Sequence, residues 1–297
     1  MNKLKLKSML EQFFLEDLGD GDMSSQALFS ERDGSTFHFI AKDTGVFCGR
    51  EVIQAGFSIM NPNIKVHTHV ADGEVVEPGM VIAEATGPAA DLLQAERVIL
   101  NLVQRMSGIA TQTAEIVTLV NNQQVRICDT RKTTPGLRML EKYAVRCGGG
   151  FNHRSGLYDA VMLKDNHIAF KGSISSAVKE VKAKLGHTVK IEVEVETRAG
   201  LREAVESGAD IIMFDNRTPE EIADWLKDVP PHIITEASGG ITKENITAYA
   251  GTGVQYISLG FLTHTVNVLD ISAKVLNAQG MIPEGGNQNE FITSIKK

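Results

Sequence analysis

Residues 125–138 read VRICDTRKTTPGLR, an apolar run that gives way to a strongly charged segment. The β-branched residues of VRICDT favour a short buried strand. Residues 129–138 hold three cations and one carboxylate, although the chain as a whole carries a formal net charge of −7. A basic segment in an acidic protein indicates a site for an anionic ligand.

The same alternation of apolar run and helical pattern repeats along the rest of the chain. Repeated βα units predict a parallel sheet covered by helices. Because no dinucleotide-binding fingerprint is present, the pattern favours a partial, six-stranded parallel α/β barrel over a doubly wound sheet. The further runs are AVMLKDNHI from 160, KIEVEV from 190, DIIMFDN from 210, HIITEASGG from 232 and YISLG from 256, with helices predicted at 137–147, 173–185, 197–207, 218–227 and 242–251.

Polar or small residues stand where almost every predicted strand ends. In α/β barrels the carboxyl ends of the strands meet on one face, which carries the reactive groups. We therefore expect one shared active site. The residues at the six strand ends are Asp129, Thr130, Arg131 and Lys132; Lys164, Asp165, Asn166 and His167; Glu194 and Glu196; Asp215 and Asn216; Ser238, Gly239 and Gly240; and Ser258, Leu259 and Gly260.

Positive charge is concentrated between residues 129 and 167. This window has seven Lys and Arg against four Asp and Glu, a balance of +3, so the rest of the chain carries −10. A local positive pocket predicts a small anionic ligand, and the fork of an arginine suits planar carboxylates. Two cations in the window, Lys142 and Arg146, fit a solvated helix face equally well, and we leave both readings open.

Two glycine-containing loops and two carboxylates complete the predicted site. SGGI from 238, before a predicted helix TKENIT, and SLGFLTH from 258 both offer backbone N–H groups suited to phosphate. Glu194 and Asp215 could meet Mg²⁺ or sugar hydroxyls, and the alternative is ordinary ion pairing with nearby lysines. Glu192, Glu194 and Glu196 alternate with valines and so point to one side of their strand.

The first hundred residues have a different rhythm. MNKLKLKSMLEQFFLEDLGDGD predicts an amphipathic helix, because acids interrupt the apolar core that a signal peptide needs. Short strands with frequent turns predict antiparallel structure over 34–84. We expect an N-terminal α+β sandwich domain over 1–112, which includes the helix with Arg105, an α/β barrel over 113–270, and a C-terminal helix and tail over 271–297.

Net charge, hydrophobic runs and cysteine content indicate which partners, cross-links and cell compartment to expect. The acidic net charge disfavours nucleic acid as a partner. The sequence contains no run of about 18 apolar residues, so we expect no membrane-spanning helix. The three cysteines form no CxxC pair, so we expect neither a disulfide framework nor a zinc site and favour the cytoplasm. Cys128, inside an apolar run, reads as a buried packing residue.

Ordered motifs from residue 16 to about 270 resemble the quinolinate phosphoribosyltransferase family. They are EDLGDGDMSS, ERVILNLVQRMSGIAT, DTRKTTPGLR, EKYAVRCGGGFNHRSGLYDAVMLKDNHI, EVEVE, MFDN, EASGGI and SLGFLTH. Thr265 stands where the family has serine, and the tail after about 280 matches no motif of the family. The resemblance implies transfer of phosphoribosyl from 5-phosphoribosyl 1-pyrophosphate to quinolinate, giving nicotinate mononucleotide, pyrophosphate and CO₂ in NAD biosynthesis, with Mg²⁺ as the cofactor.

The resemblance also implies roles for individual residues. It implies homodimers with shared active sites, because family members lend the arginine at position 105 to the partner's site; assembly to a hexamer is left open. His264 is a weaker phosphate candidate, and His167 fits a loop-supporting role. The implied sets are Arg105, Thr130, Arg131, Lys132, His153, Arg154 and Lys164 for quinolinate, Lys132 and Lys164 for pyrophosphate as well, Glu194 and Asp215 for ribose or metal, and Ser238, Gly239, Gly240, Ser258, Gly260 and His264 for phosphate, with Lys132, Lys164, Glu194 and Asp215 as the catalytic group.

Three rival functions can be weighed from the sequence. A paralogue like the molybdenum-transport-associated proteins would use another acceptor, but the full arginine and histidine set argues against it. A non-catalytic barrel that binds phosphate metabolites would leave Glu194 and Asp215 without a role. The piece DGEVVEPGMVIAEATG resembles turns of biotinyl and lipoyl domains, but no lysine stands at the carrier position.

Overall fold

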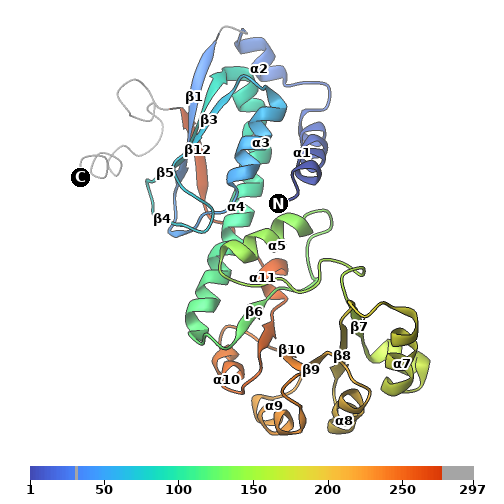
Figure 1. Cartoon of the computed structure of the whole chain (residues 1–297). Helices are drawn as coiled ribbons and strands as arrows, with labels where there is room; N and C mark the ends of the chain where they lie inside the picture. The colour runs from blue at the N-terminus through green and yellow to red at the C-terminus, as the bar shows by residue number, and fades with distance from the viewer. Residues whose placement is uncertain (31–32, 276–297) are drawn as a thin grey trace. The chain divides into compact units, whose positions relative to one another are not determined.

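The computed structural model describes residues 1–30 and 33–275, which form two compact units (Figure 1). Each unit is assembled from segments that are not contiguous in the sequence. The first unit therefore takes in two segments that a simple division after residue 112 assigns elsewhere. The first consists of Met1–Gln112, Met139–Gly149 and residues 266–275, and the second of Thr113–Arg138 and Gly150–Thr265.

The first unit is built on a four-stranded antiparallel sheet in the order β12-β1-β5-β3, which confirms the predicted antiparallel structure. Along β1, buried Phe37 and Phe39 flank the partly exposed His38, so one face of the strand enters the core. The strands are β1 Gly34–Ala41, β3 Lys65–Thr68, β5 Val81–Pro88 and β12 Ile271–Val275, and a separate ladder joins β2 Gly45–Val46 to β4 Val75–Val76.

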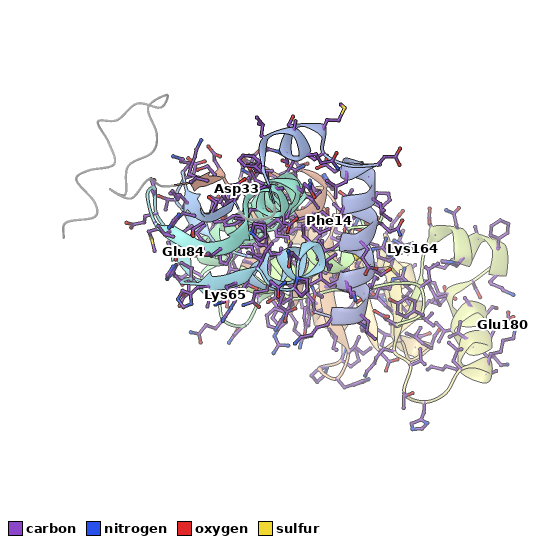
Figure 2. The ribbon with its side chains drawn as sticks, turned by 90° about the horizontal axis from the view of Figure 1, so that it is seen from above. Phe14, Asp33, Lys65, Glu84, Lys164 and Glu180 are labelled. Atoms are coloured by element: carbon purple, nitrogen blue, oxygen red, sulfur yellow. The ribbon has the colours of Figure 1, made fainter. Side chains whose placement is uncertain are left out.

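Helices pack on this sheet unit. The predicted N-terminal amphipathic helix is α1, which buries Leu6, Leu10 and Phe14 at four-residue spacing. Phe14, labelled in Figure 2, lies against α3, where a Cβ on Gly56 would stand 3.6 Å from its Cζ atom. The sequence predicts the strands around α3 but not this helix. The helices are α1 Lys3–Leu18, α2 Met23–Leu28, α3 Arg50–Met60 and the first part of α4 Ala89–Val120.

Helix α4 is continuous through Ser107 and Gly108. The structure shows close packing, because a Cβ on Gly108 would lie 2.1 Å from the carbonyl oxygen of Asn267. The buried hydroxyl of Ser107 accepts the backbone N–H of Cys48 at 3.0 Å and donates to its carbonyl at 3.2 Å. These contacts fix α4 against the segment that leads into α3.

The predicted C-terminal helix is wrong where the structure tests it. Residues 271–275 form strand β12, which pairs with β1 in antiparallel register from Ala41↔Ile271 to Phe37↔Val275. This strand covers an edge of β1 that would otherwise be unpaired. The rest of that expectation, from residue 276, lies outside the described residues. In the described part of the chain, no helix is long and apolar enough to cross a membrane.

The second unit contains a six-stranded parallel sheet in the order β6-β11-β10-β9-β8-β7. Chain neighbours are spatial neighbours throughout, except that β6 and β7 lie at opposite edges. This is the strand order of a barrel opened between its first and second strands, and among the described residues no ladder closes it. The strands are β6 Arg126–Cys128, β7 Val161–Leu163, β8 Ile191–Val195, β9 Ile211–Asp215, β10 Ile234–Ser238 and β11 Tyr256–Ser258.

Helices follow the strands of this sheet, as the sequence predicts (Figure 1). Cys128 is buried in β6, which confirms its expected packing role. α5 follows β6 in the chain, although all of it beyond Arg138 belongs to the first unit. The helices after β6 are α5 Arg138–Cys147, α6 Asp165–Lys171, α7 Ile174–Lys184, α8 Arg198–Glu206, α9 Pro219–Trp225 with the 3₁₀ turn Leu226–Asp228, α10 Ile246–Ala250 and α11 Phe261–His264.

Candidate active site

A cavity of about 760 Å³ lies at the carboxyl ends of the parallel strands, within the second unit. Its size suits a small-molecule or nucleotide ligand. Of the residues to which a catalytic or binding role is assigned, all except Arg105 line it, so the structure brings together residues from six strand ends. The other strand-end residues that do not line it are Asp129, Asp165, Asn166, His167, Glu196 and Leu259. The predicted residues in the wall are Thr130, Arg131, Lys132, His153, Arg154, Lys164, Glu194, Asp215, Ser238, Gly239, Gly240, Ser258, Gly260 and His264.

Six further residues line the cavity without a predicted role. Asn216 is among the predicted strand-end residues, directly after Asp215, but no ligand is assigned to it. The two methionines lie inside strands, where only the inward-facing alternation points to the cavity. The six are Met162, Met213, Asn216, Ile241, Thr242 and Phe261.

One side of the cavity is cationic, with Arg131, Lys132, Arg154 and Lys164 in its wall. The Nε atom of Arg131 is buried and has no hydrogen-bond partner among the described residues. Burial and the charge of Arg131 lower the pKa of Arg154. A buried donor without a partner beside crowded positive charge fits an anionic ligand that would accept from these groups.

Asp129 organises this side without lining the cavity. Its buried carboxylate accepts the side-chain amide of Asn152 at 2.6 Å and the backbone N–H of His153 at 2.9 Å. The isolated bridge between Cys128 and Phe151 continues the connection. The loop that carries His153 and Arg154 is therefore fixed to the end of β6.

His153 directs its ring nitrogens toward protein groups. Nδ1 accepts the backbone N–H of Arg154 at 2.8 Å, and Nε2 lies 3.1 Å from Oε2 of Glu192 and 3.7 Å from Oε1 of Glu236. An Nδ1 that accepts carries no proton, so Nε2–H faces the carboxylates. This geometry makes His153 a residue that positions Arg154.

Glu236 is the main ionisable group that the sequence does not reveal. It is 4% exposed, and burial together with the charge of Glu192 raises its pKa to about 7. One of its oxygens and the hydroxyl of Ser258 have no geometrically well-formed hydrogen bond among the described residues. Ligand atoms of His153, Glu192 and Glu236 lie within 4.8 Å of one another, so they could also hold a cation.

Glu194 and Asp215 also line the cavity, at the ends of adjacent strands. Lys164 forms an ion pair with Glu194, and Asn216 donates its amide N–H to Asp215 at 2.9 Å. Burial raises the pKa of Glu194, while Lys164 opposes that rise. Carboxylate oxygens are the ligands that Mg²⁺ prefers, so these two side chains fit such an ion as well as sugar hydroxyls.

The loop after β10 forms a glycine turn. Gly239 and Gly240 have φ values of 84° and 65°, and a Cβ on Gly239 would lie 2.3 Å from Oδ1 of Asn216. The expected helix over 242–251 begins only at Ile246, and before it Thr242 donates its backbone N–H to the Asn245 side chain at 2.8 Å. The turn, and not a helix N-terminus, faces the cavity here.

Four further basic residues or histidines between positions 129 and 167 do not line the cavity: Arg138, Lys142, Arg146 and His167. Arg138 donates to the Thr133 hydroxyl at 2.9 Å and to the carbonyl of Ser155 at 3.2 Å. His167 accepts the backbone N–H of Lys164 at 3.1 Å, which agrees with a loop-supporting role. Lys142 is buried and Arg146 is exposed, and both belong to the first unit.

Arg105 also belongs to the first unit, where it pairs with α5. Its Nη2 and Nε atoms donate to Oε1 of Glu141 at 2.7 and 2.9 Å. The Glu141 side chain is 1% exposed and that of Arg105 is 27% exposed. The guanidinium is therefore held by a buried carboxylate of the same chain.

Comparison with known proteins identifies the family to which the chain belongs. The model of the quinolinate phosphoribosyl transferase N-terminal domain matches residues 22–107, and that of its C-terminal domain matches residues 109–274. The chain belongs to the quinolinate phosphoribosyltransferase family. Both halves of the family pattern are present, and they join within α4.

Individual members of the quinolinate phosphoribosyltransferase family are similar over nearly the whole chain. A probable nicotinate-nucleotide pyrophosphorylase [carboxylating] of Bacillus subtilis is 55% identical over 96% of this chain and 98% of its own length. The protein of the same name from Synechocystis is 41% identical over 90% and 91%. The crystal structure of NadC from Streptococcus pyogenes superposes with a TM-score of 0.89 at 38% identity, over 92% and 97% of the two chains.

Proposed function

We propose that this chain transfers the phosphoribosyl group of 5-phosphoribosyl 1-pyrophosphate to quinolinate and releases pyrophosphate and CO₂, giving nicotinate mononucleotide for NAD biosynthesis. The family membership makes it a phosphoribosyltransferase. The observation that carries the specific reaction is that one cavity is lined by four cations, two carboxylates and glycine-containing strand ends together. These are the groups that a dianionic pyridine and a phosphorylated sugar require together.

Quinolinate, a planar dicarboxylate, would bind at the cationic side. Arg131 and Arg154 supply forked donors, and the unpartnered Nε of Arg131 supports a ligand at this point. Lys132, Lys164 and the Thr130 hydroxyl line the same cavity. His153 would act by holding the backbone of Arg154, because its own nitrogens face Arg154, Glu192 and Glu236.

The phosphoribosyl donor would occupy the remaining wall. Glu194 and Asp215 would accept the ribose hydroxyls, and Lys132 and Lys164 would meet the pyrophosphate. The positive-φ turn at Gly239 and Gly240 supports a phosphate at this loop, since such turns aim backbone N–H groups at an anion. The 5′-phosphate set is Ser238, Gly239, Gly240, Ser258, Gly260 and His264.

Mg²⁺ is the cofactor that we propose, held by Glu194, Asp215 or the donor's own oxygens. The cavity passes a simple test of fit, because it contains two carboxylates and the hard cation prefers oxygen ligands. When bound, the ion would neutralise charge on the pyrophosphate.

The mechanism needs positioning and charge more than covalent help. The pyridine nitrogen forms a bond to the anomeric carbon as the bond from that carbon to pyrophosphate breaks. The oxocarbenium-like transition state gains from Glu194 and Asp215, and Lys132 and Lys164 stabilise the leaving group. The ring nitrogen becomes cationic, so it stabilises the carbanion left when CO₂ departs, and this carbon then takes up a proton. Transfer therefore precedes decarboxylation.

We propose a homodimer in which Arg105 of each subunit completes the partner's quinolinate site, with hexamers left open. The partly exposed guanidinium of Arg105 supports this role, because Glu141 fixes it while part of it remains accessible. We also propose that the enzyme acts in the cytoplasm. Its three cysteines are free thiols in the structure, which suits a reducing compartment.

The decisive experiment supplies purified protein with Mg²⁺, phosphoribosyl pyrophosphate and quinolinate. Nicotinate mononucleotide and CO₂ are expected in equal amounts. Lys164→Met should abolish both products, whereas Lys171→Met, which alters an exposed ion pair with Glu180 on neighbouring helices, should leave both unchanged. Donor binding without either product would favour a paralogue with another acceptor, or a non-catalytic binder.

A further inference from the structure

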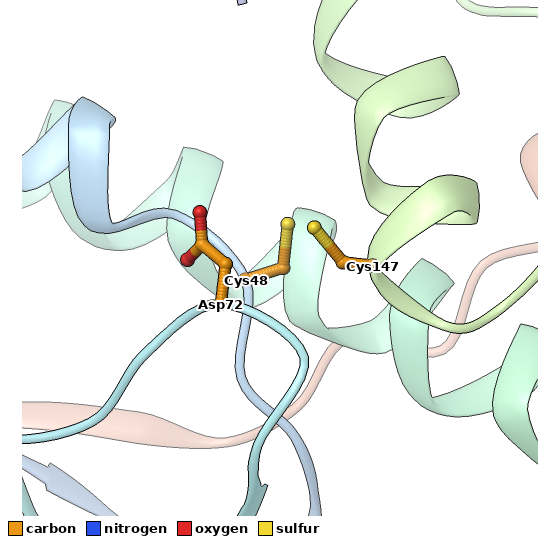
Figure 3. Close-up of side chains that lie close together, drawn as sticks. All are labelled: Cys48, Asp72 and Cys147. Carbon is orange, nitrogen blue, oxygen red and sulfur yellow. The ribbon is translucent and has the colours of Figure 1, made fainter.

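Two thiols and a carboxylate meet in the first unit, and the proposed reaction uses none of them. Cys48 lies between β2 and α3, Asp72 lies before β4, and Cys147 ends α5. The sulfur and oxygen atoms of the three side chains lie within 4.8 Å of one another. Figure 3 shows the two sulfur atoms directed toward each other, with Asp72 beside Cys48.

Asp72 holds the two cysteine-bearing segments together. One carboxylate oxygen accepts the backbone N–H groups of Gly49 and Arg50 at 2.8 and 2.9 Å, at the start of α3. The other accepts the hydroxyl of Tyr143 in α5 at 2.7 Å. The residue after Cys48 and the helix that ends at Cys147 are thus bound to one side chain, so the proximity of the thiols is built into the fold.

The two thiols are chemically unequal. Cys48 is completely buried, and burial raises its pKa well above the ordinary value. Cys147 is partly exposed, and a hydrogen bond with the Cys48 thiol is the main cause that lowers its pKa. Cys147 is therefore the thiol that becomes an accessible nucleophile, and Cys48 is a protonated thiol directly behind it.

We propose that Cys48 and Cys147 form a modification site at which a peroxide generates a reversible disulfide. The Cys147 thiolate attacks a peroxide oxygen, so that an S–O bond forms, the O–O bond breaks, and water leaves after protonation. The Cys48 sulfur then displaces the hydroxyl group of the sulfenic acid as an S–S bond forms, and its proton leaves with a second water. Two thiols are oxidised and one peroxide is reduced, and an external thiol reverses the change.

The alternative to a disulfide is that the same three side chains bind a soft metal ion. Both thiols would then have to ionise, and Asp72 would have to bind the ion while it already accepts three hydrogen bonds. The disulfide needs only the two sulfur atoms and leaves the contacts of Asp72 in place. The geometry therefore favours the disulfide.

The test treats the wild-type protein with hydrogen peroxide at a small molar excess and maps its peptides without reduction. A Cys48–Cys147 peptide is expected, with free thiols in the denatured protein falling from three to one and returning to three after dithiothreitol. Cys128→Ser should form the same cross-link, since that thiol is buried in the other unit. Cys147→Ser should form none.

Other results would overturn the proposal. These are a cross-link that includes Cys128, overoxidation of Cys147 while Cys48 stays free, or loss of neither thiol. Stoichiometric zinc in the purified protein, removed by Cys147→Ser and protecting both thiols from peroxide, would assign the site to a metal instead. If the Cys147→Ser variant does not fold, the wild-type peptide map alone decides among these results.

Discussion

The ammonium group of Lys164, at the end of β7, forms an ion pair with the carboxylate of Glu194 on the neighbouring strand β8. Both side chains line the cavity, so a cation and an anion stand side by side in its wall. The ribose hydroxyls of the proposed donor can donate to the carboxylate of Glu194, and its pyrophosphate can pair with the ammonium group of Lys164. The pair therefore marks the boundary between the proposed sugar and pyrophosphate positions.

Removing the carboxylates should damage use of the donor more than binding of quinolinate. For Glu194→Gln and Asp215→Asn, kcat/KM for phosphoribosyl pyrophosphate should fall roughly 10- to 100-fold each, the loss expected for hydrogen bonds to a charged group. Steady-state kinetics and equilibrium binding of quinolinate measure the two effects. Glu196→Gln, exposed just beyond the same strand, is the matched control. Equal losses for both substrates would contradict the assignment.

The glycine turn permits a matched pair of substitutions. Gly239→Ala should be the worse of the two, because a Cβ there would lie 2.3 Å from Asn216 Oδ1 in addition to the strain of a φ of 84°. Gly240→Ala, with a φ of 65° and nothing within 4 Å, should lose only about 1 kcal/mol of unfolding free energy. Urea unfolding and KM for the donor check both, and equal effects would contradict a close approach at Gly239.

Glu236 should make stability depend on pH. Its pKa of about 7 in the folded protein exceeds the ordinary 4.5, so the folded state keeps a proton that the unfolded chain releases. The stabilisation is complete below about pH 4.5 and is lost as pH rises through 7, by roughly 3 kcal/mol. Wild type should therefore lose more unfolding free energy than Glu236→Gln between about pH 5 and pH 8. Parallel losses in urea titrations at the two pH values would refute this.

The proposed sharing of active sites between two subunits predicts rescue between two inactive variants. Arg105→Ala and Lys132→Ala should each abolish activity, and random mixed dimers should regain about a quarter of it, since half the dimers would hold one intact site. Activity after refolding of the mixture measures this. Glu141→Gln tests the support of Arg105, since it removes the charge that holds the guanidinium, and should weaken quinolinate binding. No recovery in the mixture would rule out shared sites.

The strand-end residues were predictable because parallel strands deliver their carboxyl ends to one edge. Glu236 was not, because it precedes its strand end by two residues, and its proximity to His153 depends on how the strands lie side by side. The proximity of Cys48 to Cys147 could not be predicted for a related reason. It depends on contacts of Asp72 with two segments that are far apart in the sequence. Helix α3 was not predicted, because strand-like runs precede and follow it in the sequence and favoured β structure for the whole segment.

The interleaving of α5 and β12 with the first unit has a consequence for how the chain must be made. A fragment that ends at Gln112 would lack Met139–Gly149 and the strand that covers the edge of β1, so its sheet would be left open to self-association. The second unit, expressed alone, would carry a gap between Arg138 and Gly150. Synthesis must therefore reach β12 before the first unit is complete, and the chain should unfold in one cooperative transition.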